Sequence, residues 1–198
     1  MFMTNSINNI EYVTSLVQGK YPILKTEVIS QYQIAFEVNK EDVHGILSFL
    51  KTSGWIQLSY LSAIDWIEEG KFELVYIVFN WDNPVHIQLR TKIDRQKPEM
   101  NSILPIYPGC KYYEREAHEF FGIVFPGNPD SMKQLILEGW DDIPPLRKDF
   151  DPRAYSDAHF SKREYSETFI ELNGQESKQG KRQLRKEKIL EVRKGGKK

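Results

Sequence analysis

The chain has 198 residues, of which 40% are hydrophobic and 28% are charged, and its formal net charge at pH 7 is −1. This composition is ordinary for a globular protein, and no apolar run approaches the roughly 20 residues that a membrane-spanning helix needs. A single cysteine, Cys110, excludes an intramolecular disulfide and a cysteine-ligated iron–sulfur cluster held by this chain alone.

The N-terminal part is predicted to form a helix, a hairpin and a second helix. Apolar residues recur at helical spacing over 7–17, and two short apolar runs at 23–29 and 33–38, separated by a turn, favour a β-hairpin. Asn39 is a suitable cap for a helix over 40–54, where Gly54 provides the stop.

Three further strands are predicted over 55–63, 72–80 and 85–93. Residues 81–84 contain Asp, Asn and Pro, which are typical of a turn between the last two strands. The third strand alternates apolar Val85, Ile87 and Leu89 with polar residues. This period of two predicts one buried face and one face that meets water or a partner.

Residues 107–121 are predicted to enter a helix that ends at Gly122, after which prolines and glycines interrupt the chain as far as Pro152. Such a segment cannot form long helices or strands on its own, yet it carries apolar side chains. It either lies on another polypeptide or packs on its own domain, and composition leaves both open. We expect an α+β fold with a mixed or antiparallel sheet of about five strands and helices packed on it (1–121), a proline-rich, partner-binding arm (122–173) and a flexible basic tail (174–198).

Charge is concentrated in the tail. Ten basic and three acidic residues follow position 173, so the tail carries a net charge of +7 and the rest of the chain −8. The tail is interpreted as a solvated end, a contact for anionic lipid headgroups, or a contact for an acidic partner. No aromatic residues interleave its lysines, so a nucleic-acid partner is not expected.

The helix before Gly122 carries Glu114, Arg115, Glu116, His118 and Glu119 among large aromatic residues. Three of them, Glu114, His118 and Glu119, are metal-ligand types, but the Glu-x-x-His and His-Glu-x-x-His spacings are absent. A general acid–base pair lacks an accompanying nucleophile, phosphate loop or oxyanion motif. An ion-pair network that holds an interface is favoured, because buried charges require partners.

Two segments resemble the signatures of the thirty-kilodalton subunit of complex I, also called the C subunit of NADH:quinone oxidoreductase. The first is 103–123, with its Glu-Arg-Glu triplet and Gly-Ile end; the second is 144–150, Pro-Pro-Leu-Arg-Lys-Asp-Phe. The resemblance covers about residues 10–152. Asn128 and residues 141–143 depart from the complex I pattern, and the region of 128–133 with Trp140 is more similar to membrane-bound nickel–iron hydrogenases and archaeal relatives. The resemblance therefore does not determine the electron donor or the electron acceptor of the complex.

The resemblance implies a non-catalytic structural subunit in the peripheral part of a proton-translocating NADH:quinone oxidoreductase-type complex. Its partners would be the large quinone-site or hydrogenase-type subunit and neighbouring iron–sulfur subunits. No catalytic, cofactor-binding or metal residue is expected in this chain; iron–sulfur clusters and a flavin or nickel–iron centre would belong to the partners. The residues assigned to the interface are Glu114, Arg115, Glu116, Glu119, Trp140, Leu146, Arg147, Lys148, Asp149 and Phe150.

We expect the chain on the cytoplasmic side of the cell membrane, attached peripherally through the complex. One alternative is the equivalent subunit of a membrane-bound hydrogenase or of a ferredoxin- or deazaflavin-linked archaeal complex. The alternative from another class is a stand-alone metal-dependent enzyme that uses Glu114, His118 and Glu119.

Overall fold

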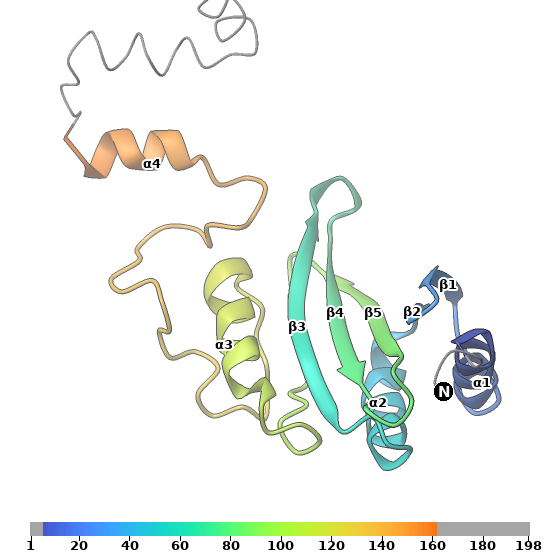
Figure 1. Ribbon diagram of the computed structural model, residues 1–198. Coiled ribbons are helices and arrows are strands. Elements are labelled where there is room, and N and C mark those ends of the chain that lie inside the picture. The colour runs from blue at the N-terminus through green and yellow to red at the C-terminus, as the bar shows by residue number, and fades with distance from the viewer. Residues whose placement is uncertain (1–5, 162–198) are drawn as a thin grey trace, which may run out of the picture. The chain divides into compact units, whose positions relative to one another are not determined.

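The structure, a computed structural model, describes residues 6–161 (Figure 1). The chain divides into two units, and the boundary between them lies after Phe150. The predicted tail and the last part of the predicted arm, residues 162–173, lie outside the described residues. The elements in chain order are α1 (Ser6–Gln18), β1 (Lys25–Ser30), β2 (Gln33–Glu37), η1 (Lys40–Asp42), α2 (Val43–Thr52), β3 (Gln57–Trp66), η2 (Ile67–Glu69), β4 (Lys71–Phe79), β5 (His86–Asp94), α3 (Cys110–Phe121) and α4 (Pro152–His159).

The five strands form one mixed sheet in the order β1-β2-β5-β4-β3. Strands β2 and β5 are parallel, and the other three pairs are antiparallel. The parallel pair arises because α2 and the β3–β4 hairpin lie between β2 and β5 in the sequence. The expected α+β class with a mixed sheet is confirmed, and so is the hairpin of β1 and β2.

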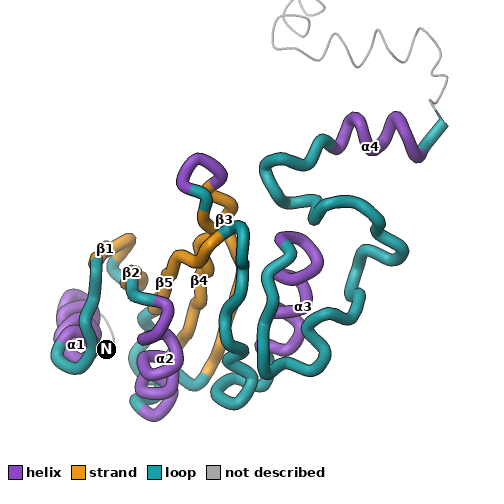
Figure 2. The backbone as a smooth tube through the Cα atoms, turned by 180° about the vertical axis from the view of Figure 1, so that it is seen from behind, coloured by secondary structure: helices purple, strands orange, loops and turns teal. Residues whose placement is uncertain are grey.

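The core lies against one face of this sheet. Residues on β5 alternate as predicted: Ile87 and Leu89 are fully buried, whereas the intervening polar side chains are half-buried. On β4, Leu74 and Tyr76 point to the same buried face. In the view of Figure 2, α2 lies between the viewer and the strands. Apolar residues of α1, α2 and α3 complete the core.

Strand β3 differs from its predicted range of 55–63 and runs over Gln57–Trp66. Trp55 is not in the strand because its backbone N–H donates to Leu50 at the end of α2, while its indole N–H donates to the Val85 carbonyl. At the other end, pairing continues until Trp66 lies opposite Lys71. The strand is therefore displaced toward its C-terminus, where the turn at η2 closes the hairpin.

Two glycines end helices as predicted. Gly122 follows α3 with φ +75°, a left-handed conformation that suits glycine, and its N–H donates to the His118 carbonyl. Gly54 follows α2 with φ +104°. Gly122 also has close neighbours, because an added Cβ would lie 2.6 Å from Nη2 of Arg147. Gly122 therefore both ends α3 and leaves room for Arg147 of the following segment to pack closely against it.

Helix α4 was not predicted, because the preceding prolines suggested an extended path throughout. Its start is capped by Asp151, whose Oδ1 accepts from the N–H groups of Arg153 and Ala154 at 2.9 and 3.1 Å, with Pro152 in the first turn. Within residues 6–161, no helix is long and apolar enough to cross a membrane.

Candidate partner interface

Helix α3 holds the first part of the proline-rich arm by its backbone. The Glu119 carboxylate accepts from three consecutive N–H groups, those of residues 135–137, at 2.9 to 3.0 Å. One turn earlier, Arg115 donates to the carbonyls of Lys133 and Gln134. We call this arrangement the loop contact. It satisfies backbone groups of an irregular segment that would otherwise need water.

A second arrangement, the Asp65 cluster, joins the sheet to residues 144–150. The buried Asp65 carboxylate accepts from Arg95 Nε and Nη2 at 2.9 and 3.1 Å, and from the Lys148 N–H at 2.8 Å. Arg95 Nη2 also donates to Asp149 at 2.7 Å. The cluster comprises Asp65, Arg95, Asp149 and the Lys148 amide.

The Asp65 cluster keeps both of its carboxylates ionised. Burial alone would raise the pKa of Asp65, but hydrogen bonds from Arg95 and from the Lys148 amide, with the charge of Arg95, outweigh burial and lower that pKa below its ordinary value. For Asp149, the hydrogen bond from Arg95 is the main cause of a lowered pKa. The Arg95 pKa is raised by the same two hydrogen bonds.

Arg147 packs where α3 ends. Its Nε donates to the Phe121 carbonyl at 2.7 Å, which satisfies a C-terminal carbonyl of the helix. Its guanidinium lies 5.4 Å from the centre of the Phe72 ring, and the Arg95 guanidinium lies 5.6 Å from that same ring. Two cations thus contact one buried aromatic ring, an arrangement that stabilises the junction between α3, the sheet and the arm.

Glu114 is fully buried and faces the core. It accepts from Ser102 Oγ at 2.7 Å, from the Ile103 N–H at 2.9 Å and from Asn128 Nδ2 at 2.9 Å. The Cys110 thiol also donates to it at 3.3 Å, and burial together with this carboxylate raises the pKa of that thiol. Four donors compensate the buried charge, so Glu114 connects α3 to the two loops beside it.

The remaining predicted interface residues are placed as follows. The rings of Trp140 and Phe150 contact each other with centroids 5.4 Å apart, and both are half-buried. Leu146 is exposed, and its N–H donates to the Phe120 carbonyl. The Lys148 side chain is exposed, while Glu116 is half-buried on α3. The charges predicted to pair with a partner at Arg147 and Asp149 therefore already have partners in this chain; a role for these residues toward a partner stays a prediction.

The structure does not bring the three possible metal ligands together. Glu114 faces the core, His118 Nδ1 contacts the Ile123 carbonyl at 2.9 Å, and Glu119 holds the loop backbone. Residues 6–161 contain no group of three His, Cys, Asp or Glu side chains that could hold a metal ion. The geometry thus gives no support to the metal-dependent alternative.

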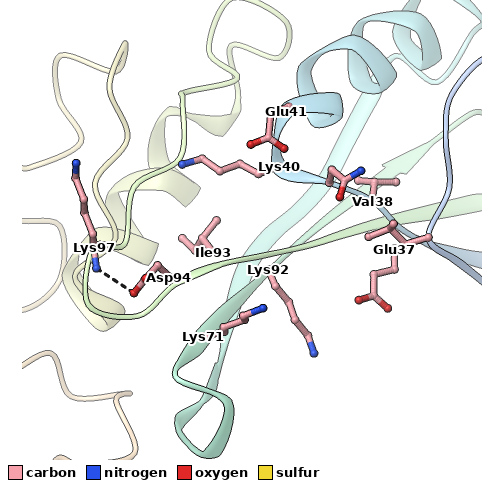
Figure 3. A pocket seen from close by; sticks show the side chains of 11 residues that line it. Glu37, Val38, Lys40, Glu41, Lys71, Lys92, Ile93, Asp94 and Lys97 are labelled. Atoms are coloured by element: carbon pink, nitrogen blue, oxygen red, sulfur yellow. Dashed lines mark hydrogen bonds between the residues drawn. The ribbon is translucent and has the colours of Figure 1, made fainter.

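A surface depression of about 520 Å³ lies near the ends of β2 and β5 (Figure 3). Four lysines line it: Lys40, Lys71, Lys92 and Lys97. Acidic residues lie between them, and Lys92 is already paired with Glu69 at 2.6 Å. Such a polar, open lining lacks the apolar enclosure of a typical small-molecule site.

Sequence reasoning missed Arg95 and Asn128. The sequence places Arg95 in a polar loop, where a single arginine belongs to no periodic or spaced motif that would mark it as important. Asn128 stands out there only as a departure from the family, although its side chain binds Glu114 and the Lys111 carbonyl. The available signal for Asn128 was that a polar residue stands between Gly127 and Pro129, at a position where the chain departs from the complex I pattern.

Residues 36–156 match the family described as "Respiratory-chain NADH dehydrogenase, 30 Kd subunit". This range contains both the loop contact and the Asp65 cluster. Among curated relatives, the C subunit of the F(420)H(2) dehydrogenase of Methanosarcina mazei is 33% identical over 141 residues, which are 67% of this chain and 86% of the relative. The C subunit of the NADH-quinone oxidoreductase of Moorella thermoacetica is 34% identical over 119 residues, which are 59% of this chain and 78% of the relative.

Solved structures show the same fold. A chain in a structure described as "the membrane-bound sulfane sulfur reductase (MBS), an archaeal respiratory membrane complex" aligns with a TM-score of 0.71 at 28% identity. That alignment covers 81% of this chain and 97% of the other. A fragment described as Nqo5 aligns with a TM-score of 0.52 at 21% identity, which shows likeness of fold alone.

Proposed function

The chain belongs to the family of the 30 kDa subunit of respiratory-chain NADH dehydrogenase, and from this membership we propose that it is a non-catalytic structural subunit of a complex I-like electron-transfer complex. Its work is to hold neighbouring polypeptides in place. The α+β unit provides a rigid support, and the proline-rich arm extends the surface that partners contact.

One observation carries this proposal: the names of proteins similar to the chain specify different redox substrates. The relatives include subunits of an F(420)H(2) dehydrogenase and of NADH-quinone oxidoreductases, and the similar solved chain comes from a sulfane sulfur reductase. A subunit shared among complexes with different redox substrates is best explained by a role that does not depend on the substrate. The charged residues of α3, which hold backbone and core groups, agree with such a role.

We propose as partners the large quinone-site or hydrogenase-type subunit and the neighbouring iron–sulfur subunits. Iron–sulfur clusters, and a flavin or nickel–iron centre, would then belong to those partners and not to this chain. Attachment to the cytoplasmic face of the membrane would come through the complex.

A second form of the same function places the chain in an archaeal-type complex rather than a NADH-linked one. The similarity to the sulfane sulfur reductase chain, over 97% of that chain's length, favours this form. The departures at Asn128 and residues 141–143 from the usual complex I pattern point the same way.

Affinity purification of the tagged chain from detergent-solubilised native membranes tests the proposal. We expect a large subunit and iron–sulfur subunits to co-purify at fixed stoichiometry, as identified by mass spectrometry. A co-purifying NADH-oxidising module would identify the NADH-linked form, its absence beside the other redox subunits would favour the archaeal-type form, and a nickel-binding large subunit would identify a membrane-bound hydrogenase. Recovery of the chain without redox subunits, or turnover by the isolated chain, would refute the proposal.

A further inference from the structure

The Glu-Arg-Glu triplet of α3 distributes its charges among three surroundings. Glu114 faces the core and is fully satisfied there. Arg115 donates to loop carbonyls, and Glu119, one turn later, accepts from loop amides. Among residues 6–161, by contrast, no hydrogen bond or ion pair involves the Glu116 carboxylate. The triplet therefore has one charge without a partner in the described chain.

Glu116 lies in an aromatic part of the surface. On a helix, its neighbours one turn away are Tyr112, Tyr113, Glu119 and Phe120; of these, Glu119 is already engaged by the loop amides. Tyr112 is 59% exposed, and the Tyr113 ring contacts that of Tyr60 on β3 with centroids 5.9 Å apart. Glu116 itself is half-buried, and its carboxylate makes no hydrogen bond among residues 6–161.

Two cations on the same helix are already engaged. Lys111 is paired with Asp130 at 2.5 Å, and Lys133 also pairs with Asp130; these two lysines lower the Asp130 pKa to about 2. Arg115 lies over the Tyr112 ring, but its nitrogens are directed to the carbonyls of the loop contact. A cation for Glu116 must therefore come from a group that these contacts do not use.

We propose that Glu116 binds an arginine side chain of a neighbouring subunit, which lies against the exposed Tyr112 of α3. The inference rests on the proposed function and specifies one contact through which it operates. A carboxylate matches the planar guanidinium with two parallel hydrogen bonds, and tyrosine faces attract the same cation. Tyrosine and arginine are also the residue types that contribute most to protein interfaces.

Substitutions at Glu116 separate this contact from a structural role. Glu116→Gln keeps the shape of the side chain and removes its charge, while Glu116→Lys reverses the charge. The matched control is Glu11→Gln, since Glu11 is an exposed helical glutamate without a partner among the described residues. Each variant is produced as the full chain, its thermal unfolding is measured alone, and its binding to the partner subunits is measured by co-purification and titration.

We expect unchanged unfolding temperatures for the isolated Glu116→Gln chain, because the structure gives Glu116 no partner to lose. Affinity for the partner subunits should fall about tenfold with Glu116→Gln and about a hundredfold with Glu116→Lys. Added salt should weaken binding of the unmodified chain more than that of Glu116→Gln, and Glu11→Gln should behave as the unmodified chain.

Two results would overturn the inference, and a third would remove its premise. Unchanged affinity of Glu116→Gln, while the unmodified chain binds its partners, would show that Glu116 makes no such contact although the proposed function holds. A lowered unfolding temperature of the isolated variant would show that the carboxylate pairs within its own chain. If even the unmodified chain binds no redox subunit, the proposed function itself fails.

Discussion

The guanidinium of Arg95 and the carboxylate of Asp65 meet through two parallel hydrogen bonds, 2.9 and 3.1 Å long, and the Asp65 side chain is fully buried. The same guanidinium reaches Asp149, so one arginine joins the end of β3 to the second family signature. Lysine could not make this forked contact. In this chain the signature 144–150 therefore holds the arm to its own sheet.

Asp65→Asn should destabilise the isolated chain. The amide offers one acceptor oxygen where the carboxylate uses two, and the largely buried guanidinium of Arg95 keeps only Asp149 as a counter-charge. We expect the free energy of unfolding to fall by about 3 kcal/mol. Urea titration measures the change, with Asp82→Asn as the control, because Asp82 is exposed and has no side-chain partner among the described residues. Equal midpoints for the two variants would contradict the importance of the cluster.

Acid should weaken the same cluster. Because the pKa values of Asp65 and Asp149 are lowered in the folded chain, their contribution to stability is complete above the ordinary aspartate pKa of about 3.9. It is lost as pH falls through the lower folded-state values. Unfolding free energies measured between pH 7 and pH 2 should therefore fall less steeply below pH 4 in Asp65→Asn than in the unmodified chain. Parallel curves would show that other carboxylates dominate acid unfolding.

Glu119→Gln should loosen the loop contact without unfolding the sheet. A glutamine offers one acceptor oxygen in place of two, whereas three amides of residues 135–137 need acceptors. Hydrogen exchange of those amides should accelerate on the order of tenfold or more, while β4 and β5 amides keep their rates. Glu138→Gln, an exposed change in the same segment, serves as the control and should leave all of these rates unchanged.

Gly122→Ala should lower the free energy of unfolding more than Gly70→Ala does. Both glycines have positive φ, +75° and +65°, so alanine is strained at each by about 1 kcal/mol. Around Gly70 no atom lies within 4 Å of an added Cβ, whereas at Gly122 the added Cβ meets Arg147 Nη2 at 2.6 Å and Pro144 Cγ at 3.2 Å. Thermal unfolding should show an additional loss of about 1 kcal/mol or more at Gly122. A larger loss at Gly70 would mean that the junction between α3 and the arm is loosely packed.

The local elements could be predicted because local patterns determine them. The period of two in β5, the turn at 81–84 and the glycines after α2 and α3 each act within a few residues. The order of the strands could not be predicted in this way, since the pairing of β2 with β5 joins segments about 50 residues apart. Strand β3 is displaced from its predicted range because the Trp55 N–H donates to the end of α2 and its indole is buried in the core, so that Trp55 does not pair in the sheet.

The sequence singles out the charged residues of α3 but does not indicate what they contact; that they meet a partner subunit stays a prediction. Glu114, Arg115 and Glu119 are recognisable in the sequence as charges that need partners, yet the partners of two of them are backbone groups, which sequence does not distinguish. Arg147 and Asp149 were predicted to pair with a partner subunit, while the structure gives them Phe121 and Arg95. Long-range pairs of this kind arise from the tertiary fold, and residue type alone does not indicate them.

The most direct measurement compares the amount of assembled complex with the turnover of each assembled complex in Arg115→Ala. Removing the guanidinium leaves the carbonyls of Lys133 and Gln134 without their donor and weakens the loop contact, while the redox groups of the proposed complex belong to the partner subunits. We predict several-fold less complex on native gels, with normal turnover per complex that does assemble. A complex with normal amount and stoichiometry but slow turnover would contradict the view that this chain holds its neighbours together while electrons pass elsewhere.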